Sequence, residues 1–167
     1  MSGTYINNAG VLQKNITLQN IIQIHEAICS ELTTIQENSF GDIFEIEINQ
    51  TTLYPLAHLS IENANYSTHE LTYNLRLYVM DLVQKDESNE NDVLSDTMQT
   101  IGDYISKLKH SSTINSLTFD TEHDFRINDN ISCEPFTERF DAEVSGWTAN
   151  ISITVSFNAG NCVGDTM

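Results

Sequence analysis

The side chains best able to do chemistry are five histidines, at His25, His58, His69, His110 and His123. No two of them stand three or four residues apart, the spacing that two metal ligands on one helical face need. His25 falls on the apolar side of a predicted helix, which favours a buried, hydrogen-bonded role over a ligand role. The loop holding His123 and Asp124 lacks the glycine and terminal glutamate of an EF-hand, so a cation site there is the less favoured interpretation. We expect no metal and no cofactor.

Sequence signatures of the common enzyme classes are missing. The chain contains no GxSxG, GxxxxGK[ST] or GxGxxG motif, which would indicate acyl transfer, triphosphate binding or dinucleotide binding. Carboxylates are so abundant that pairs of them will meet by chance on the surface. Any catalytic triad would have to be assembled from residues scattered along the chain, and no such set is predicted here.

The charge of the chain is unusual, because 24 acidic residues oppose 7 basic ones and give a formal net charge of -17. Seven basic residues cannot neutralise many phosphates, so nucleic-acid binding is not expected. Anionic membrane surfaces would repel the protein as well. A surface this acidic suits high solubility, a basic protein partner, or a pore wall past which a polyanion must slide.

Cysteine usage and the first residues indicate the compartment. Cys29, Cys133 and Cys162 are widely separated and form no CxxC pair, so neither a disulfide framework nor a zinc site is predicted. The first ten residues lack the basic and apolar regions of a signal peptide, and no apolar run reaches the roughly 18 residues of a membrane span. We expect synthesis in a reducing cytoplasm and no membrane association.

Residues 70–108 contain the predicted strand and helix around which the rest of the fold is arranged. A strand is predicted from the alternation of Leu71, Tyr73, Leu75, Leu77 and Val79. After the acidic stretch 84–92 a helix is predicted from a stripe formed by Leu94, Met98, Ile101, Ile105 and Leu108. The two apolar faces match, which predicts a helix packed on a sheet.

The remaining segments complete the predicted fold. A first helix is expected from an N-cap at Thr17 to Ile35, with strands at 44–48, 53–64, 117–119 and 136–157, a turn at 63–68 and a loop at 120–130. Pro55 is expected near a strand start, bulge or edge, and the apolar register changes at Gly146, which predicts a bulge or a tight turn. The fold class is α+β: a mainly antiparallel sheet with two amphipathic helices on one face.

The domain plan is an N-terminal arm at 1–16, a single domain at 17–160 and a C-terminal tail at 161–167. On the second face of strand 70–83, Thr72 and Asn74 are polar whereas Tyr78, Met80 and Leu82 are not. We expect a neighbouring subunit to cover part of that face.

Two long runs resemble a known family. They are LYPLAHLSIENANYSTHELTYNLRLYVMDLVQKDESNENDVLSDTMQTIGDYI, from Leu53 to Ile105, and EPFTERFDAEVSGWTANISITV, from Glu134 to Val155. Together with the order of elements over about 17–160, these runs resemble the tail-terminator or tail-completion proteins of tailed bacteriophages. The matching features are Pro55, the VMDLV strand end with Asp81, the VLSDT helix start with Asp96, and Trp147 after Gly146. We regard Pro55, Asp81, Asp96 and Trp147 as candidate interface residues, although Trp147 also fits a core position.

The resemblance implies a non-enzymatic virion protein whose α+β protomer closes into a homo-oligomeric ring, of six or possibly twelve subunits. Such a ring joins head or portal components to the tail, contacts other neck or tail proteins, and leaves a channel through which DNA passes without specific binding. The family supplies no catalytic residues and no cofactor. The protein would be made in the cytoplasm of a bacterial host and end in the virion.

The acidic stretch is the candidate channel surface. We expect Asp86, Glu87, Glu90 and Asp92 to face the lumen, where their charge would keep the phosphate backbone from adhering. A solvated outer loop explains the same composition. Two other functions fit the sequence: a small cytoplasmic α+β binding domain or enzyme using His58, His69 or His123, and an acidic inhibitor that mimics nucleic acid.

Overall fold

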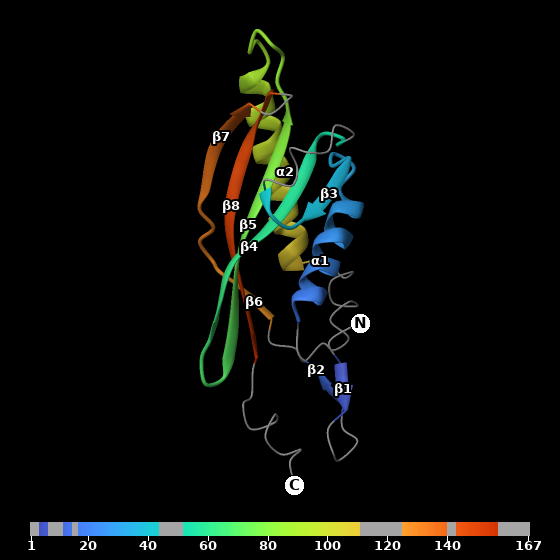
Figure 1. Cartoon of the computed structure of the whole chain (residues 1–167), viewed down its shortest axis with the longest axis vertical. Coiled ribbons are helices and arrows are strands. Elements are labelled where there is room, and N and C mark those ends of the chain that lie inside the picture. The colour runs from blue at the N-terminus through green and yellow to red at the C-terminus, as the bar shows by residue number, and fades with distance from the viewer. Residues whose placement is uncertain are drawn as a thin grey trace.

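The chain forms one six-stranded sheet and two helices in a computed structural model that describes residues 4–6, 12–14, 17–43, 52–110, 125–139 and 143–156. The elements are β1 (Thr4–Ile6), β2 (Leu12–Lys14), α1 (Leu18–Glu31), β3 (Glu37–Phe40), β4 (Leu56–Tyr66), β5 (Glu70–Leu82), α2 (Glu90–His110), β6 (Phe125–Ile127), β7 (Cys133–Arg139) and β8 (Glu143–Ser156) (Figure 1).

The order of strands in the six-stranded sheet is β3-β4-β5-β8-β6, and β7 also pairs with β8. Within this sheet β3 runs parallel to β4 and the other pairs are antiparallel. The predicted α+β class is confirmed. A separate two-stranded sheet joins β1 and β2.

Both helices pack on the same face of the sheet, as predicted. The residues beneath them are mostly odd-numbered and buried, including Ala57, Leu59, Leu71, Tyr73, Leu75, Leu77, Val79, Ala149, Ile151, Ile153 and Val155. In β5 this set is the predicted alternation, so the strand turns one apolar face toward the helices. The main core therefore lies between this face and the two helices.

Helix α1 begins as predicted and ends earlier. The hydroxyl of Thr17 accepts a hydrogen bond from the Asn20 N–H, and the Asn20 side chain accepts one from the Thr17 N–H, which forms a reciprocal cap. The helix stops at Glu31, and Leu32 is its C-cap. Ile35, which was predicted to be helical, reaches the core from the turn that follows.

Helix α2 begins at Glu90, one turn before the predicted start, and its buried face is rotated from the predicted stripe. Its buried residues are Val93, Thr97, Thr100, Ile101, Tyr104 and Leu108, whereas Leu94, Met98 and Ile105 are only half-buried. Threonine can occupy the buried face because its hydroxyl bonds to its own helix: Thr97 donates to the Val93 carbonyl at 2.6 Å, and Thr100 donates to the Asp96 carbonyl at 3.0 Å.

The second face of the sheet carries a smaller core. Leu56, Met80 and Val144 are buried there, and Tyr78 and Phe136 pack against them. This cluster covers the apolar end of the face from within the chain. Met80 is thus buried within the chain, whereas Tyr78 is half-buried and Leu82 is exposed, and coverage of that face by a neighbouring subunit stays a prediction.

The register change at Gly146 is not a bulge or a turn. β8 pairs with β5 without interruption, from the pair of Val144 with Leu82 to that of Ser156 with Glu70. The apolar register changes because Val144 belongs to the smaller core, whereas the odd-numbered residues from Trp147 to Val155 face the helices. Gly146 is required for another reason: a Cβ there would lie 1.9 Å from the Val79 carbonyl oxygen.

Two further predictions about elements were wrong, and one strand was missed. Strand β3 was not predicted at all, the predicted loop 120–130 contains β6, and the predicted turn 63–68 is shorter because β4 continues to Tyr66. The predicted strands 44–48 and 117–119 lie outside the described residues, as do Phe140 and Ala142.

Candidate interaction surface

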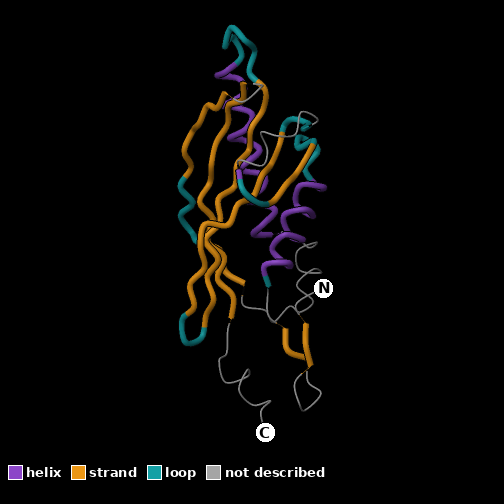
Figure 2. The backbone as a smooth tube through the Cα atoms, in the orientation of Figure 1, coloured by secondary structure: helices purple, strands orange, loops and turns teal. Residues whose placement is uncertain are grey.

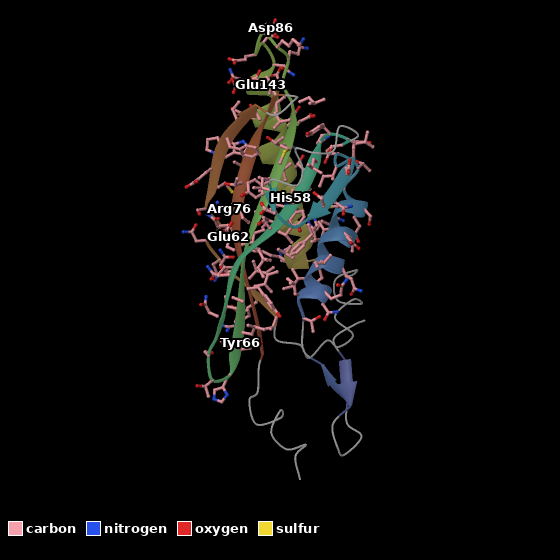
Figure 3. All side chains as sticks on the ribbon, in the orientation of Figure 1. His58, Glu62, Tyr66, Arg76, Asp86 and Glu143 are labelled. Atoms are coloured by element: carbon pink, nitrogen blue, oxygen red, sulfur yellow. The ribbon has the colours of Figure 1, made fainter. Side chains whose placement is uncertain are left out.

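The acidic loop lies at one end of the molecule. Figure 3 places Asp86 at this tip and Tyr66 near the opposite end. Asp86 and Glu87 are exposed in the loop between β5 and α2. Side-chain and backbone hydrogen bonds from Ser88 lower the pKa of the Asp86 carboxyl, so it is charged at neutral pH. The loop is also fixed by the Gln84 N–H, which donates to the Asn89 side chain at 2.8 Å.

The four predicted channel residues do not share one environment. Asp92 is exposed in the first turn of α2, like the loop acids before it, but Glu90 is half-buried. One Glu90 carboxylate oxygen accepts hydrogen bonds from the Thr137 hydroxyl at 2.9 Å and from the Ser145 hydroxyl at 3.3 Å. Glu90 thus ties the start of α2 to β7 and β8, which gives it a structural role. Asp86, Glu87 and Asp92 remain as an exposed acidic tip.

Three of the candidate interface residues meet in one groove. Its volume is about 430 Å³, and it is lined by Thr34, Pro55, Asp81, Asp96, Thr97, Gln99, Thr100 and Asp103. Pro55 and Asp81 lie close together because their neighbours Leu56 and Met80 are paired in the sheet. Burial raises the pKa of the Asp81 carboxyl, the Leu82 N–H opposes that rise, and the charge of Asp96 adds to it. The groove is polar and acidic.

Trp147 is not part of this groove. Its indole N–H donates to the Leu94 carbonyl of α2 at 2.8 Å, and its ring packs on the main core. The side chain therefore holds α2 against β8, which is the core alternative recognised from the sequence.

The β4–β5 hairpin projects past the lower ends of both helices, and its strands continue almost to the turn (Figures 1 and 2). Residues 61–70 are all exposed. Ile61 and Tyr66 are exposed by 37% and 69%, so two large side chains of this segment face solvent. We call residues 61–70 the hairpin arm. The sequence did not predict that this segment stands clear of the core, because its β4 residues alternate like those of a covered strand and pair, among the described strands, with β5 alone.

Ion pairs and hydrogen bonds brace the arm. Glu62, at the bulge in β4, forms an ion pair with Arg76 at 3.5 Å, and Glu70 pairs with Arg126 of β6. The Asn74 side chain donates to the Asn63 side chain at 2.6 Å. Such exposed pairs contribute little stability, so the arm is held mainly by its backbone pairing with β5.

Two histidines lie buried next to β3. Burial lowers the pKa of His25 to about 4, and its ring bonds to the Tyr104 hydroxyl at 2.8 Å and to the Ser39 carbonyl at 3.0 Å. The predicted buried, hydrogen-bonded role of His25 is confirmed. His58 bonds to the Ser39 hydroxyl at 2.6 Å and to the Gly41 carbonyl at 2.9 Å.

The histidines named for a possible enzyme pocket do not come together. His58 is buried, whereas His69 is exposed in the turn of the arm. At about 3.3 Å per residue, β4 carries the chain roughly 25 Å from His58 to Tyr66, near that turn. His123 lies outside the described residues.

The described residues offer neither a metal cluster nor a membrane-spanning helix. Within them, no three His, Cys, Asp or Glu side chains are arranged to hold a metal ion, the acids of the groove included. None of the described helices is long and apolar enough to cross a membrane. What the described surface offers is therefore an acidic tip, an acidic groove and a projecting arm.

No protein-family model and no curated protein sequence matches the chain.

Proposed function

We propose that this chain is a non-enzymatic structural protein of a tailed-phage virion. Its protomers form a homo-oligomeric ring of six or twelve copies in the neck or tail, which joins head or portal components to the tail. DNA passes through the channel of this ring without specific binding. The proposal rests on the sequence resemblance and is supported by three features of the fold.

The hairpin arm is the observation that carries the proposal. It extends the sheet beyond the helices that cover the main core, and all ten of its residues, 61–70, are exposed. Ordering such a segment costs conformational entropy that its own exposed contacts do little to offset. A partner surface would supply the missing burial, and repeated contacts between identical protomers close a ring. Ile61 and Tyr66 are the natural anchors, because large apolar and aromatic side chains dominate interface energies.

The acidic groove is the second supporting feature. It brings Pro55, Asp81 and Asp96, chosen from separate parts of the sequence, into one concave surface. We assign it to contact with a neighbouring protomer or another neck or tail protein.

The acidic tip is the third feature, and we assign Asp86, Glu87 and Asp92 to the channel. With a net charge of -17, a ring of six copies would carry strong negative potential, which repels DNA over about 8 Å at physiological salt. Glu90 is left out because its carboxylate bonds to Thr137 and Ser145.

Electron microscopy of the purified chain, alone and with portal or tail components, tests the proposal. We expect closed rings with the arm at the interface between protomers and Asp86 on the lumen wall. Particles that remain single protomers in every mixture would overturn the ring. Closed rings with Asp86 on the outer wall would overturn only the assignment of the channel surface.

A further inference from the structure

Three residues of β4 in the hairpin arm lie on the face of the sheet that carries the main core. Directly opposed residues of an antiparallel pair share a face, and the register shift at Glu62 keeps the later two of the three on that face. Their partners in β5 are buried members of the main core, in the pairs Ile61 with Leu75, Ala64 with Tyr73, and Tyr66 with Leu71. We call Ile61, Ala64 and Tyr66 the apolar strip.

The main core ends at β5 in this part of the sheet. Leu71 and Tyr73 are buried, each with 8% exposure, whereas the apolar strip beside them faces solvent. Ile61 is exposed by 37% and Tyr66 by 69%, and Ala64 is exposed as well. The apolar strip therefore continues the face of the main core past the residues that fill that core.

The opposite face of the arm is polar, and its groups bond to one another. The Asn63 side chain accepts hydrogen bonds from the side chains of Asn65 at 3.3 Å and of Asn74 at 2.6 Å. An antiparallel sheet commonly buries its apolar face and leaves its polar face to water. The apolar strip is thus the face of the arm that a partner would cover.

The N-terminal hairpin, formed by β1 and β2, is a sheet of only two strands. Thr4 pairs with Lys14 and Ile6 with Leu12, and among the described strands neither β1 nor β2 pairs with the six-stranded sheet. An isolated two-stranded hairpin is at best marginally stable in water, so packing on another surface would stabilise it. Figure 1 shows this hairpin at the same end of the molecule as the arm, with the two standing apart.

Charge favours contact between the N-terminal hairpin and the arm of another copy. The first acidic residue of the chain is Glu26, so the hairpin carries no acidic side chain and has one basic residue, Lys14. All 24 acidic residues follow it, and copies of so acidic a chain repel each other where their acids meet. Glu62 and Glu70, the two acids of the arm, each form an ion pair with an arginine. Contact between the two segments therefore joins parts whose negative charge is absent or already paired.

We propose that the N-terminal hairpin of one copy docks on the apolar strip of a second copy. This inference rests on the proposed self-assembly, and it names the segment of the neighbouring protomer that the arm contacts. The hairpin contains Tyr5, Ile6 and Leu12, which are residue types that can bury Ile61 and Tyr66. Because the two surfaces differ, the contact is heterologous, and its repetition around an axis closes a ring.

Photo-crosslinking in the full-length protein tests this docking. A benzophenone analogue of phenylalanine replaces Tyr5, and these chains are mixed with isotope-labelled chains that lack the crosslinker, so that mass spectrometry separates links between copies from links within one copy. We expect the main product to join residue 5 to residues 61–66 of another copy. In Ile61→Thr/Tyr66→Thr the yield of this product should fall at least about tenfold, because both apolar anchors are lost. Leu53→Thr, which changes an exposed residue outside the arm, should keep the yield of the wild type.

Charge reversal at two lysines gives an independent test. Lys14→Glu and Lys109→Glu change the net charge equally, but Lys14 lies in the N-terminal hairpin whereas Lys109 is exposed near the end of α2. Lys14→Glu should lower the yield of the crosslink by about threefold or more, and Lys109→Glu should leave it unchanged. An equal loss in both variants would contradict the docking.

Mass photometry of the same samples separates a failure of the docking from a failure of the ring. Oligomers whose crosslinks from residue 5 reach other parts of the chain, or stay within one copy, would overturn the docking and leave the ring standing. Chains that remain single protomers, even with portal or tail components, would overturn both.

Discussion

The two halves of strand β4 differ in almost every respect except their backbone geometry. From Leu56 to Leu59 every residue is buried, with β3 on one side, β5 on the other and a core on each face. From Ile61 to Tyr66 every residue is exposed, and β5 is the strand paired with it. The change occurs at the bulge around Glu62, where the register with β5 shifts.

The buried half of β4 belongs to the folded core of the protomer, whereas the exposed half belongs to a surface that another chain can contact. The first half contributes residues to both cores and carries His58, which bonds to Ser39 and Gly41. The second half has no buried residue, yet it is regular sheet, and its Glu62 forms an ion pair with Arg76 of β5. A segment ordered at that cost, without burial of its own, is what an assembly surface requires.

The largest expected loss of unfolding free energy comes from a substitution in the buried half of β4. Leu59→Ala removes a side chain that is 2% exposed beneath the helices, and should lower the free energy of unfolding by about 2–5 kcal/mol, because a cavity remains in the core. Urea denaturation monitored by circular dichroism measures this change. A loss below about 1 kcal/mol would mean that the first half of β4 is not part of a packed core.

The next effect is a dependence of stability on pH that originates at His25. Its pKa is about 4 in the folded protein, against 6.5 for an unperturbed histidine, so between these values the unfolded chain binds the proton more strongly. Stability from this group is therefore complete above about pH 6.5 and declines as the pH falls toward 4, by about 3 kcal/mol in total. Urea denaturation across this range should show a flatter pH dependence for His25→Gln. His69→Gln, which changes an exposed histidine, should keep the wild-type slope.

A smaller effect is expected at the contact between α2 and β8. Trp147→Phe keeps most of the ring but removes the N–H that donates to the Leu94 carbonyl, and should cost about 1 kcal/mol of unfolding free energy. Thermal unfolding of the two proteins compares them. If Trp147 were instead an assembly anchor, the substitution would weaken oligomers and leave the stability of the protomer unchanged.

The smallest change in the stability of the protomer is expected from a substitution in the exposed half of β4. Tyr66→Ala removes a side chain that is 69% exposed, and should change the stability of the protomer by no more than about 0.5 kcal/mol. The measurement needs a protein concentration at which the chain is monomeric, since assembly adds apparent stability. A loss of about 2 kcal/mol or more would show that the arm belongs to the folding core.

Local patterns were enough to predict much of the fold. The cap at Thr17, the alternation along β5 and the placement of both helices on one face follow from residue type and period. β3 could not be predicted, because the sequence ENSF has no apolar alternation and its strand conformation depends on pairing with β4 and on the two histidines. The same dependence on distant contacts placed Thr97 and Thr100, rather than Leu94 and Met98, on the buried face of α2.

The candidate surface was predicted only as separate residues. Pro55, Asp81 and Asp96 were chosen for their places in the sequence, but the groove that joins them depends on the β4–β5 register and on the position of α2. Glu90 could not be distinguished from its acidic neighbours, because its partner Thr137 is 47 residues away. The period of apolar residues in the sequence predicts which residues share a face of a helix or strand. Contacts between distant segments decide which residues on that face stay exposed.

Mass photometry of the wild-type chain beside an arm variant tests the central claim most directly. In Ile61→Thr/Tyr66→Thr both replacements favour strands, so the protomer should fold while losing the two apolar anchors of the arm. Leu53→Thr is the matched control, because Leu53 is also a large apolar side chain that is exposed, at 59%, and it lies outside the arm. The account predicts closed oligomers for the wild type and the control and single protomers for the arm variant. Oligomers of unchanged size and stability in the arm variant would contradict it.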